Sequence, residues 1–139
     1  MKKLLTLLLL ALSTQAYASC KYTNTVDLPP SNIHAKRIVT LFLTNRTESP
    51  VTVKVQLFDQ GEDITHLVTE NGGVAEAIGL DTIYMRFITR THNRLIGGKL
   101  TWTSESCLNK PLMGVVDSAT FHPGHYANSS ITIKNGKPF

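Results

Sequence analysis

The sequence contains one short segment in which two side chains suited to metal binding lie close together. His122 and His125 flank a Pro-Gly dipeptide, which is typical of a tight turn. Imidazole nitrogens are common ligands of zinc and copper. The segment therefore predicts two positions of a metal site, to which Met113 or Asp117 could add a third. The alternative is an ordinary surface turn, because strong metal motifs usually show three or four ligands at recurring spacing.

Basic side chains form a second candidate site, in this case for an anionic partner. Arg86, Arg90, Arg94 and Lys99 lie within one short stretch around an expected hairpin. Together they could bind lipopolysaccharide, another glycan or an acidic protein surface. The alternative is a solvated sheet edge, where charged side chains discourage pairing with other sheets.

The sequence lacks the motifs of common catalytic sites. It has no G-x-S-x-G, no H-E-x-x-H and no phosphate-binding glycine loop, the patterns that position a nucleophile, a zinc ion or a phosphate. Asp59, Glu62 and Asp63 form an acidic cluster without the spacing of a calcium loop. We therefore expect a protein without enzymatic activity and without a cofactor. An enzyme acting on envelope polysaccharide is an alternative, because a fold does not fix a function.

The N-terminal residues have the pattern of a cleaved export signal. Lys2 and Lys3 precede the apolar run 4–12, and Ala16-Tyr17-Ala18 matches an A-x-A cleavage site. The apolar run is shorter than the roughly 20 residues that a membrane-spanning helix needs. We expect cleavage after Ala18, which makes residues 1–18 a signal peptide. A retained N-terminal anchor is the alternative.

The remaining residues, 19–139, predict a single domain in the periplasm or outside the cell. Two lysines leave with the signal peptide, so the net charge of +4 falls to +2. That modest charge, the exported location and the absence of a nucleic-acid-binding motif argue against a nucleic-acid partner. No second apolar run approaches the length of a membrane span.

The two cysteines, Cys20 and Cys107, predict one disulfide bond. In an oxidising compartment two cysteines in one small domain usually pair. A bridge that closes so long a loop contributes about 4–5 kcal/mol in the chain-entropy model. The alternatives are two unpaired thiols or a lipid attached to Cys20.

The stretch from Arg37 to Asp59 predicts the central strands of the fold. In its second half Val51, Val53, Val55 and Leu57 alternate with polar residues, the period of a strand with one buried face. Residues 38–43 are apolar on both faces, which is typical of a strand inside a sheet. We expect the two strands to form a hairpin around residues 45–50. The stretch resembles one found in many immunoglobulin-like exported domains, including the N-terminal domains of periplasmic pilus chaperones.

Further strands are expected along the rest of the chain. Trp102, as the sole tryptophan, is expected at the centre of the core. Residues 64–68 predict a short strand or one helical turn, and residues 74–80 predict a short helix or a loop that crosses between sheets. The strands expected besides the central two lie within 21–36, 80–88, 99–103, 111–116 and 129–134. About seven short strands separated by Gly, Pro and Asn breaks favour an antiparallel β-sandwich of the immunoglobulin-like type.

These features predict a protein that binds another macromolecule in the bacterial cell envelope. The partner would be a protein or a glycan, held at a sheet edge or by loops. The arm 20–30 and the segment 131–139 are the candidates for a terminal strand that pairs or swaps. Expected roles are an accessory of a surface assembly, an adhesin component, or an inhibitor or immunity protein. The oligomeric state stays open.

Overall fold

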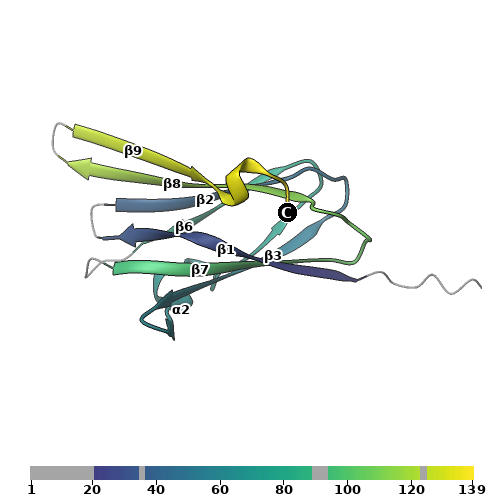
Figure 1. Ribbon diagram of the computed structural model, residues 1–139, viewed down its shortest axis with the longest axis horizontal. Helices are drawn as coiled ribbons and strands as arrows, with labels where there is room; N and C mark the ends of the chain where they lie inside the picture. Colours follow the sequence, from purple (N-terminus) through teal and green to yellow (C-terminus); the bar gives the residue numbers. More distant parts are fainter. Residues whose placement is uncertain (1–20, 35–36, 89–93, 123–124) are drawn as a thin grey trace, which may run out of the picture.

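The computed structural model describes residues 21–34, 37–88, 94–122 and 125–139. These residues form two antiparallel sheets that face each other (Figure 1), so the predicted all-β architecture is confirmed. Sheet A contains β1 (Tyr22–Ile33), β7 (Arg94–Ser104), β3 (Val51–Asp59), β4 (Glu62–Asp63) and β5 (Val74–Ala77). Sheet B has the order β6 (Thr82–Phe87), β2 (Arg37–Asn45), β8 (Leu112–His122) and β9 (His125–Thr132). Two short helices, α2 (Thr65–Val68) and η1 (Ile133–Gly136), complete the described elements.

The described residues form nine strands, two more than the seven or so that the sequence predicts. The prediction of a helix or loop over residues 74–80 is wrong for its first half, because β5 pairs with β3 along Val51–Lys54. Two alanines and a glutamate make β5 only weakly apolar, so its strand conformation depends on the neighbouring strand and not on its own pattern. Of the two alternatives for residues 64–68, a short strand or one helical turn, the structure shows the helical turn, as α2.

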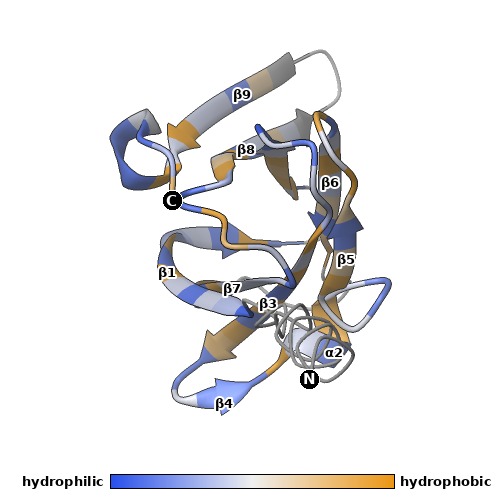
Figure 2. Ribbon diagram, turned by 90° about the vertical axis from the view of Figure 1, so that its right-hand side faces the viewer, coloured by the Kyte–Doolittle hydropathy of each residue, from blue (hydrophilic) through white to orange (hydrophobic). Residues whose placement is uncertain are grey.

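The core lies between the sheets and is filled by the alternating apolar residues of the central strands. In β3 the four predicted inward residues are at most 2% exposed. Val39, Leu41 and Leu43 of β2 face them and are fully buried. Trp102 is also fully buried, as predicted. Figure 2 shows hydrophobic and hydrophilic segments alternating along the strands.

The expected hairpin between β2 and β3 is wrong, although both strands are confirmed. The two strands lie in different sheets, and the chain crosses the core edge over residues 46–50. Asn45 fixes this crossing: it is fully buried, and its Nδ2 donates to the carbonyl oxygens of Ser49 and Ala77 at 2.8 and 3.0 Å. Its Oδ1 accepts from the backbone and hydroxyl of Thr47. The apolar faces of β2 and β3 therefore meet across the core, where each covers the other.

The expected hairpin around Arg86 and Lys99 is wrong for the same reason. β6 belongs to sheet B and β7 to sheet A. Met85 and Phe87 point into the core from one side, while Leu100 points into it from the other. A polar connection between two half-buried strands is compatible with either geometry, and the burial of both apolar faces favours the crossing.

The C-terminal residues close one end of the sandwich. Ile133 and Phe139 are each about 1% exposed, and Phe139 exchanges two backbone hydrogen bonds with Leu112, at 2.9 and 3.0 Å. Gly114 leaves the space that Ile133 occupies, since a Cβ there would lie 2.6 Å from Ile133 Cδ1. The chain after β9 is therefore packed against β8.

The predicted disulfide falls partly outside the described residues, because Cys20 is not among them. Cys107 lies in the exposed turn after β7. The neighbouring residue Lys21 forms an ion pair with Glu105 at 3.2 Å, and Tyr22 pairs with Ser104 in the antiparallel register. The start of β1 is thus adjacent to the turn that carries Cys107, and the bridge stays a prediction.

Candidate functional site

The candidate site is the outer edge of β9, the last strand of sheet B. β9 pairs with β8 from Val115 to His122, and its extensive contacts are with β8 alone. Within the described part of the chain, no strand pairs with its other side. Its backbone N–H and C=O groups on that side are available to another strand, as at any uncovered sheet edge. Figure 2 shows β9 at the far end of its layer.

The inward face of β9 extends beyond the opposing sheet. The register aligns Leu41, Val116 and Ile131 in one row across three strands. Leu41 is fully buried and Val116 is 3% exposed, whereas Ile131 is 49% exposed. We call Ala127, Ser129 and Ile131 the β9 ledge, because they share the inward face of the sheet and are nevertheless exposed. An apolar side chain from an incoming strand could cover Ile131 there.

Four basic residues lie on the segments beyond the C-terminal end of β9. We call Arg46, Lys110, Lys134 and Lys137 the basic cluster. Backbone contacts bring them together: Arg46 N donates to Pro111 O at 2.8 Å, and Lys137 N donates to Lys134 O at 3.1 Å. Because Phe139 pairs with Leu112, the turn that holds Lys134 and Lys137 lies beside the segment that holds Lys110.

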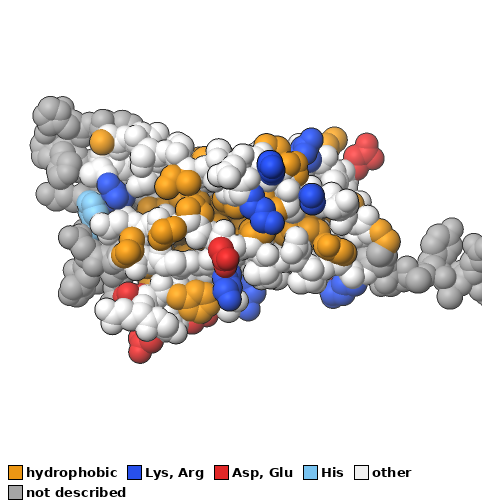
Figure 3. Space-filling view, in the orientation of Figure 1, with side chains coloured by type: hydrophobic (Ala, Val, Ile, Leu, Met, Phe, Trp, Pro, Cys, Tyr) orange, Lys and Arg blue, Asp and Glu red, His pale blue; other side chains and the backbone are white. Residues whose placement is uncertain are grey.

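The basic cluster places positive charge on the surface of the domain. All four side chains are exposed, and the ion pair found among the described residues, Lys21–Glu105, does not include them. Figure 3 shows Lys and Arg side chains gathered on the face that carries η1 and the C-terminus. Lys134 has a positive φ of 48°, followed by Asn135 at 54°, conformations that are unfavourable for residues with a side chain. The buried Ile133 and Phe139 hold this turn in place.

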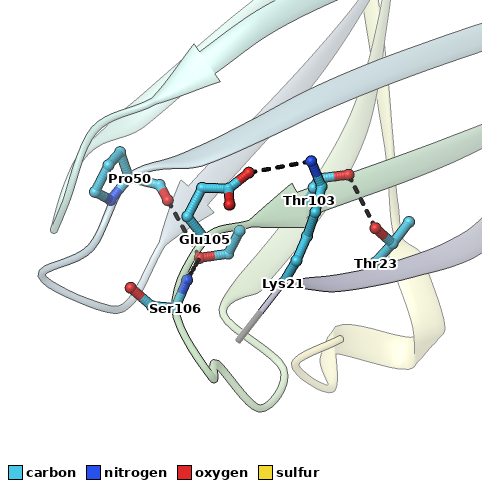
Figure 4. A network of polar contacts seen from close by, with 7 residues as sticks. Lys21, Thr23, Pro50, Thr103, Glu105 and Ser106 are labelled. Atoms are coloured by element: carbon cyan, nitrogen blue, oxygen red, sulfur yellow. Dashed lines mark hydrogen bonds and ion pairs between the residues drawn. The ribbon is translucent and has the colours of Figure 1, made fainter. Parts of the chain in front are cut away.

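β1, the edge strand of sheet A, contrasts with β9. Its Val26, Leu28 and Ile33 are buried in the core. Hydroxyl–hydroxyl hydrogen bonds link it to β7 on the outer face, at 3.2 Å for Thr23 with Thr103. Figure 4 shows this contact beside the ion pair of Lys21. Pro29 and Pro30 occupy the register break between Leu28 and Ser31, so this edge lacks two N–H donors.

The backbones of two predicted metal ligands are brought together. His122 at the end of β8 pairs directly with His125 at the start of β9. Asp117 is five residues and Met113 nine residues before His122 on the same strand. At a rise of about 3.3 Å per residue these lie about 17 and 30 Å away, too far to complete a site. Among the described side chains, no group of three His, Cys, Asp or Glu residues is placed to hold a metal ion.

The predicted basic patch is distributed over both sheets. Arg86 is exposed on the outer face of sheet B, where its Cζ lies 5.4 Å from the ring centroid of Tyr84. Lys99 is exposed on the outer face of sheet A, paired with Asp27 and Gln56. Arg94 lies at the start of β7, and Arg90 lies outside the described residues. The structure therefore does not bring Arg86 and Lys99 to one surface.

The comparisons with known proteins give no relative. No protein-family model, no curated protein and no solved structure matches this chain. In the described ranges, none of the helices combines the length and apolar character required to cross a membrane.

The basic cluster is a feature that sequence reasoning missed. Its members come from the turn after β2, the segment before β8 and the C-terminal turn, so nothing in their spacing joins them. The signal that was available was local: Lys134 and Lys137 flank an Asn-Gly pair, which indicates a turn that presents both side chains.

Proposed function

We propose that this protein is an exported, non-enzymatic domain that binds an extended segment of a protein in the bacterial cell envelope. The segment would add as a further strand beside β9, so that backbone hydrogen bonds supply affinity and alternate side chains supply specificity. The observation that carries the proposal is the exposed β9 ledge, where Ile131 continues a buried row but is itself half exposed.

The charge of the site defines the chemistry of the partner. An incoming strand would place an apolar side chain over Ile131 and acidic side chains near Lys134 and Lys137. Complementary charge of this kind raises the association rate and fixes the register. We therefore expect a partner segment with alternating apolar residues and an acidic end. Roles that fit are those of a surface-assembly accessory, an adhesin component or an inhibitor.

The immunoglobulin-like character of the sandwich is part of this proposal. β2 pairs with β6 in one sheet and β3 pairs with β7 in the other, as strands B and E and strands C and F do in immunoglobulin domains. Export and the disulfide are supported by the leader pattern and by the position of Lys21 beside Glu105.

A matched pair of variants tests the site. Ile131→Lys places a charge on the β9 ledge, and Leu95→Lys places one on β7, where Leu95 is 69% exposed. Both proteins would be used to capture partners from envelope extract. We expect the wild type and Leu95→Lys to retain the same partner and Ile131→Lys to lose it, since an inward-pointing charge at an edge blocks strand addition.

Hydrogen exchange with the captured partner then locates the contact. We expect new protection at the amides of residues 127–132 in the complex. Replacing Lys134 and Lys137 by Glu should slow association and reduce its dependence on salt. Capture that is equal for both lysine variants, or a complex without protection in β9, contradicts the proposal.

A further inference from the structure

A polar cleft lies at the opposite edge of the sandwich from β9. It has a volume of about 180 Å³ and lies between residues 69–75, which lead from α2 into β5, and the outer strand β6. Tyr84 and Arg86 form one wall, and Glu70, Asn71 and Val74 form the other. Because β6 and β9 are at the two ends of sheet B, this cleft is separate from the strand-binding site.

The walls of the cleft are fixed by backbone contacts. Thr69 forms a bridge with Phe87, and its Oγ1 donates to Thr65 O at 2.7 Å. Farther along, Val55 N donates to Gly73 O at 2.7 Å. Gly73 has a φ of 76° and no room for a side chain against Val55. The segment between these two anchors carries Glu70 and Asn71, so the cleft is preformed and a ligand need not order it.

An aromatic surface adjoins the cleft. Tyr84 is 61% exposed, and its direct neighbour across the sheet, Phe42, is 40% exposed. Two adjacent aromatic side chains on the outer face of the sheet present an exposed apolar surface, which we call the aromatic platform. Tyrosine also keeps a hydroxyl that bonds to polar ligands at the border of that platform.

The polar groups of the cleft are balanced in charge and in hydrogen-bonding type. Arg86 supplies donors in a planar fork, Glu70 supplies acceptors, and the amide of Asn71 supplies both. One positive and one negative side chain leave the cleft without net charge, which favours a neutral ligand. A sugar ring has this combination of properties: hydroxyl groups that donate and accept, and an apolar C–H face that packs on an aromatic ring.

We propose that this cleft binds one sugar ring of a neutral glycan, with the ring packed on Tyr84 and its hydroxyls bonded to Glu70, Asn71 and Arg86. The volume supports a single ring, since pockets for larger, drug-sized ligands start at about 300 Å³. Phe42 extends the platform toward the middle of sheet B and would contact the next ring of a chain. The proposal does not depend on strand addition at β9.

Titration of the exported protein with neutral trisaccharides tests this site. Cellotriose, chitotriose and maltotriose would each be added to the ¹⁵N-labelled protein, up to about 10 mM, which detects a Kd of about 1 mM. At least one sugar should shift the amide signals of residues 69–75 and 84–86. Tyr84→Ala should weaken that binding about tenfold, the effect of losing one stacking ring. Tyr84→Phe should stay within about twofold, because the ring is retained.

Leu95→Ala is the matched control, since Leu95 is also an exposed apolar residue but lies on β7. It should leave the affinity unchanged. The proposal is overturned if none of the three sugars shifts these signals. It is equally overturned if the shifts lie elsewhere, or if Tyr84→Ala binds as tightly as the wild type.

Discussion

β1 and β9 are both edge strands, but they differ in how far they are protected against pairing with another strand. β1 places Val26, Leu28 and Ile33 in the core, carries two prolines at its register break and is tied to β7 by hydroxyl pairs. An ion pair lies just beyond the ends of the two strands. β9 contains neither proline nor charged residues among Lys, Arg, Asp and Glu, and its residues 127–132 are exposed on both faces. One edge is therefore protected against pairing and the other is open to it.

Under the proposed function, this difference would let one small sandwich combine stability with binding. The residues of β1 contribute buried area, while those of β9 contribute little burial and leave their backbone groups accessible. A strand that binds a partner cannot also be fully covered by its own domain. We therefore expect changes in β1 to alter stability and changes in β9 to alter binding.

Removal of the predicted disulfide is expected to have the largest effect, because it releases the start of β1. Cys107→Ser should lower the free energy of unfolding by about 4 kcal/mol, measured by urea denaturation. Adding a reductant should lower the free energy of unfolding of the wild type by the same amount. The same reductant should leave the free energy of unfolding of Cys107→Ser unchanged. If the wild type is as stable with reductant as without it, the bridge between Cys20 and Cys107 does not exist.

Truncation of one isoleucine in each edge strand tests the comparison directly. Ile33→Ala on β1 should cost about 3 kcal/mol, because its side chain is fully buried and leaves a cavity. Ile131→Ala on β9 should cost less than about 1 kcal/mol, as for other exposed positions, yet weaken partner binding. Thermal and urea unfolding measure the loss of stability of both variants, and capture of the partner measures the loss of binding. Equal losses of stability would show that the two edges do not differ.

A smaller effect is expected at the far edge of sheet A, where β4 meets α2. The Thr65 hydroxyl donates to Asp63 and accepts from Leu57 N at 2.9 Å. The hydrogen bonds from the Thr65 side chain and then its backbone lower the pKa of Asp63 below its usual 3.8. The ionised carboxylate is thus favoured in the folded state. Its stabilisation is present above the unfolded-state pKa and is lost as the pH falls through the lower folded-state pKa.

Asp63→Asn measures this contribution. The wild type should be more stable than the variant near neutral pH, and the difference should shrink as the pH falls below 3.8. Urea midpoints at several pH values give the profile, and Glu62→Gln controls for the loss of one charge in the same hairpin. A difference that is constant with pH would exclude a role for the ionised form.

The strands and the core could be predicted from local pattern. The alternation in β3 identified its buried residues, Trp102 was expected in the core, and both are confirmed. β5 was missed because its alanines give no strong period. Its conformation follows from pairing with β3.

The pairing of the strands could not be predicted in the same way. The turns after β2 and after β6 contain polar residues that suit a hairpin as well as a crossing between sheets. The choice depends on which apolar faces cover each other, and on the burial of Asn45 with its hydrogen bonds to Ser49 and Ala77. Those contacts join residues that are distant in the sequence.

The features of the candidate sites also differ in whether local pattern could predict them. Most of the strands, their apolar faces and the candidacy of segment 131–139 for strand pairing follow from local pattern, because each depends on neighbours one to four positions apart. The exposure of β9, the approach of the three segments that carry the basic cluster, and the cleft lined by Glu70 and Tyr84 depend instead on how the two sheets pack. Exposure and proximity are properties of packed sheets, and a sequence pattern specifies which face of a strand is apolar without specifying what covers it.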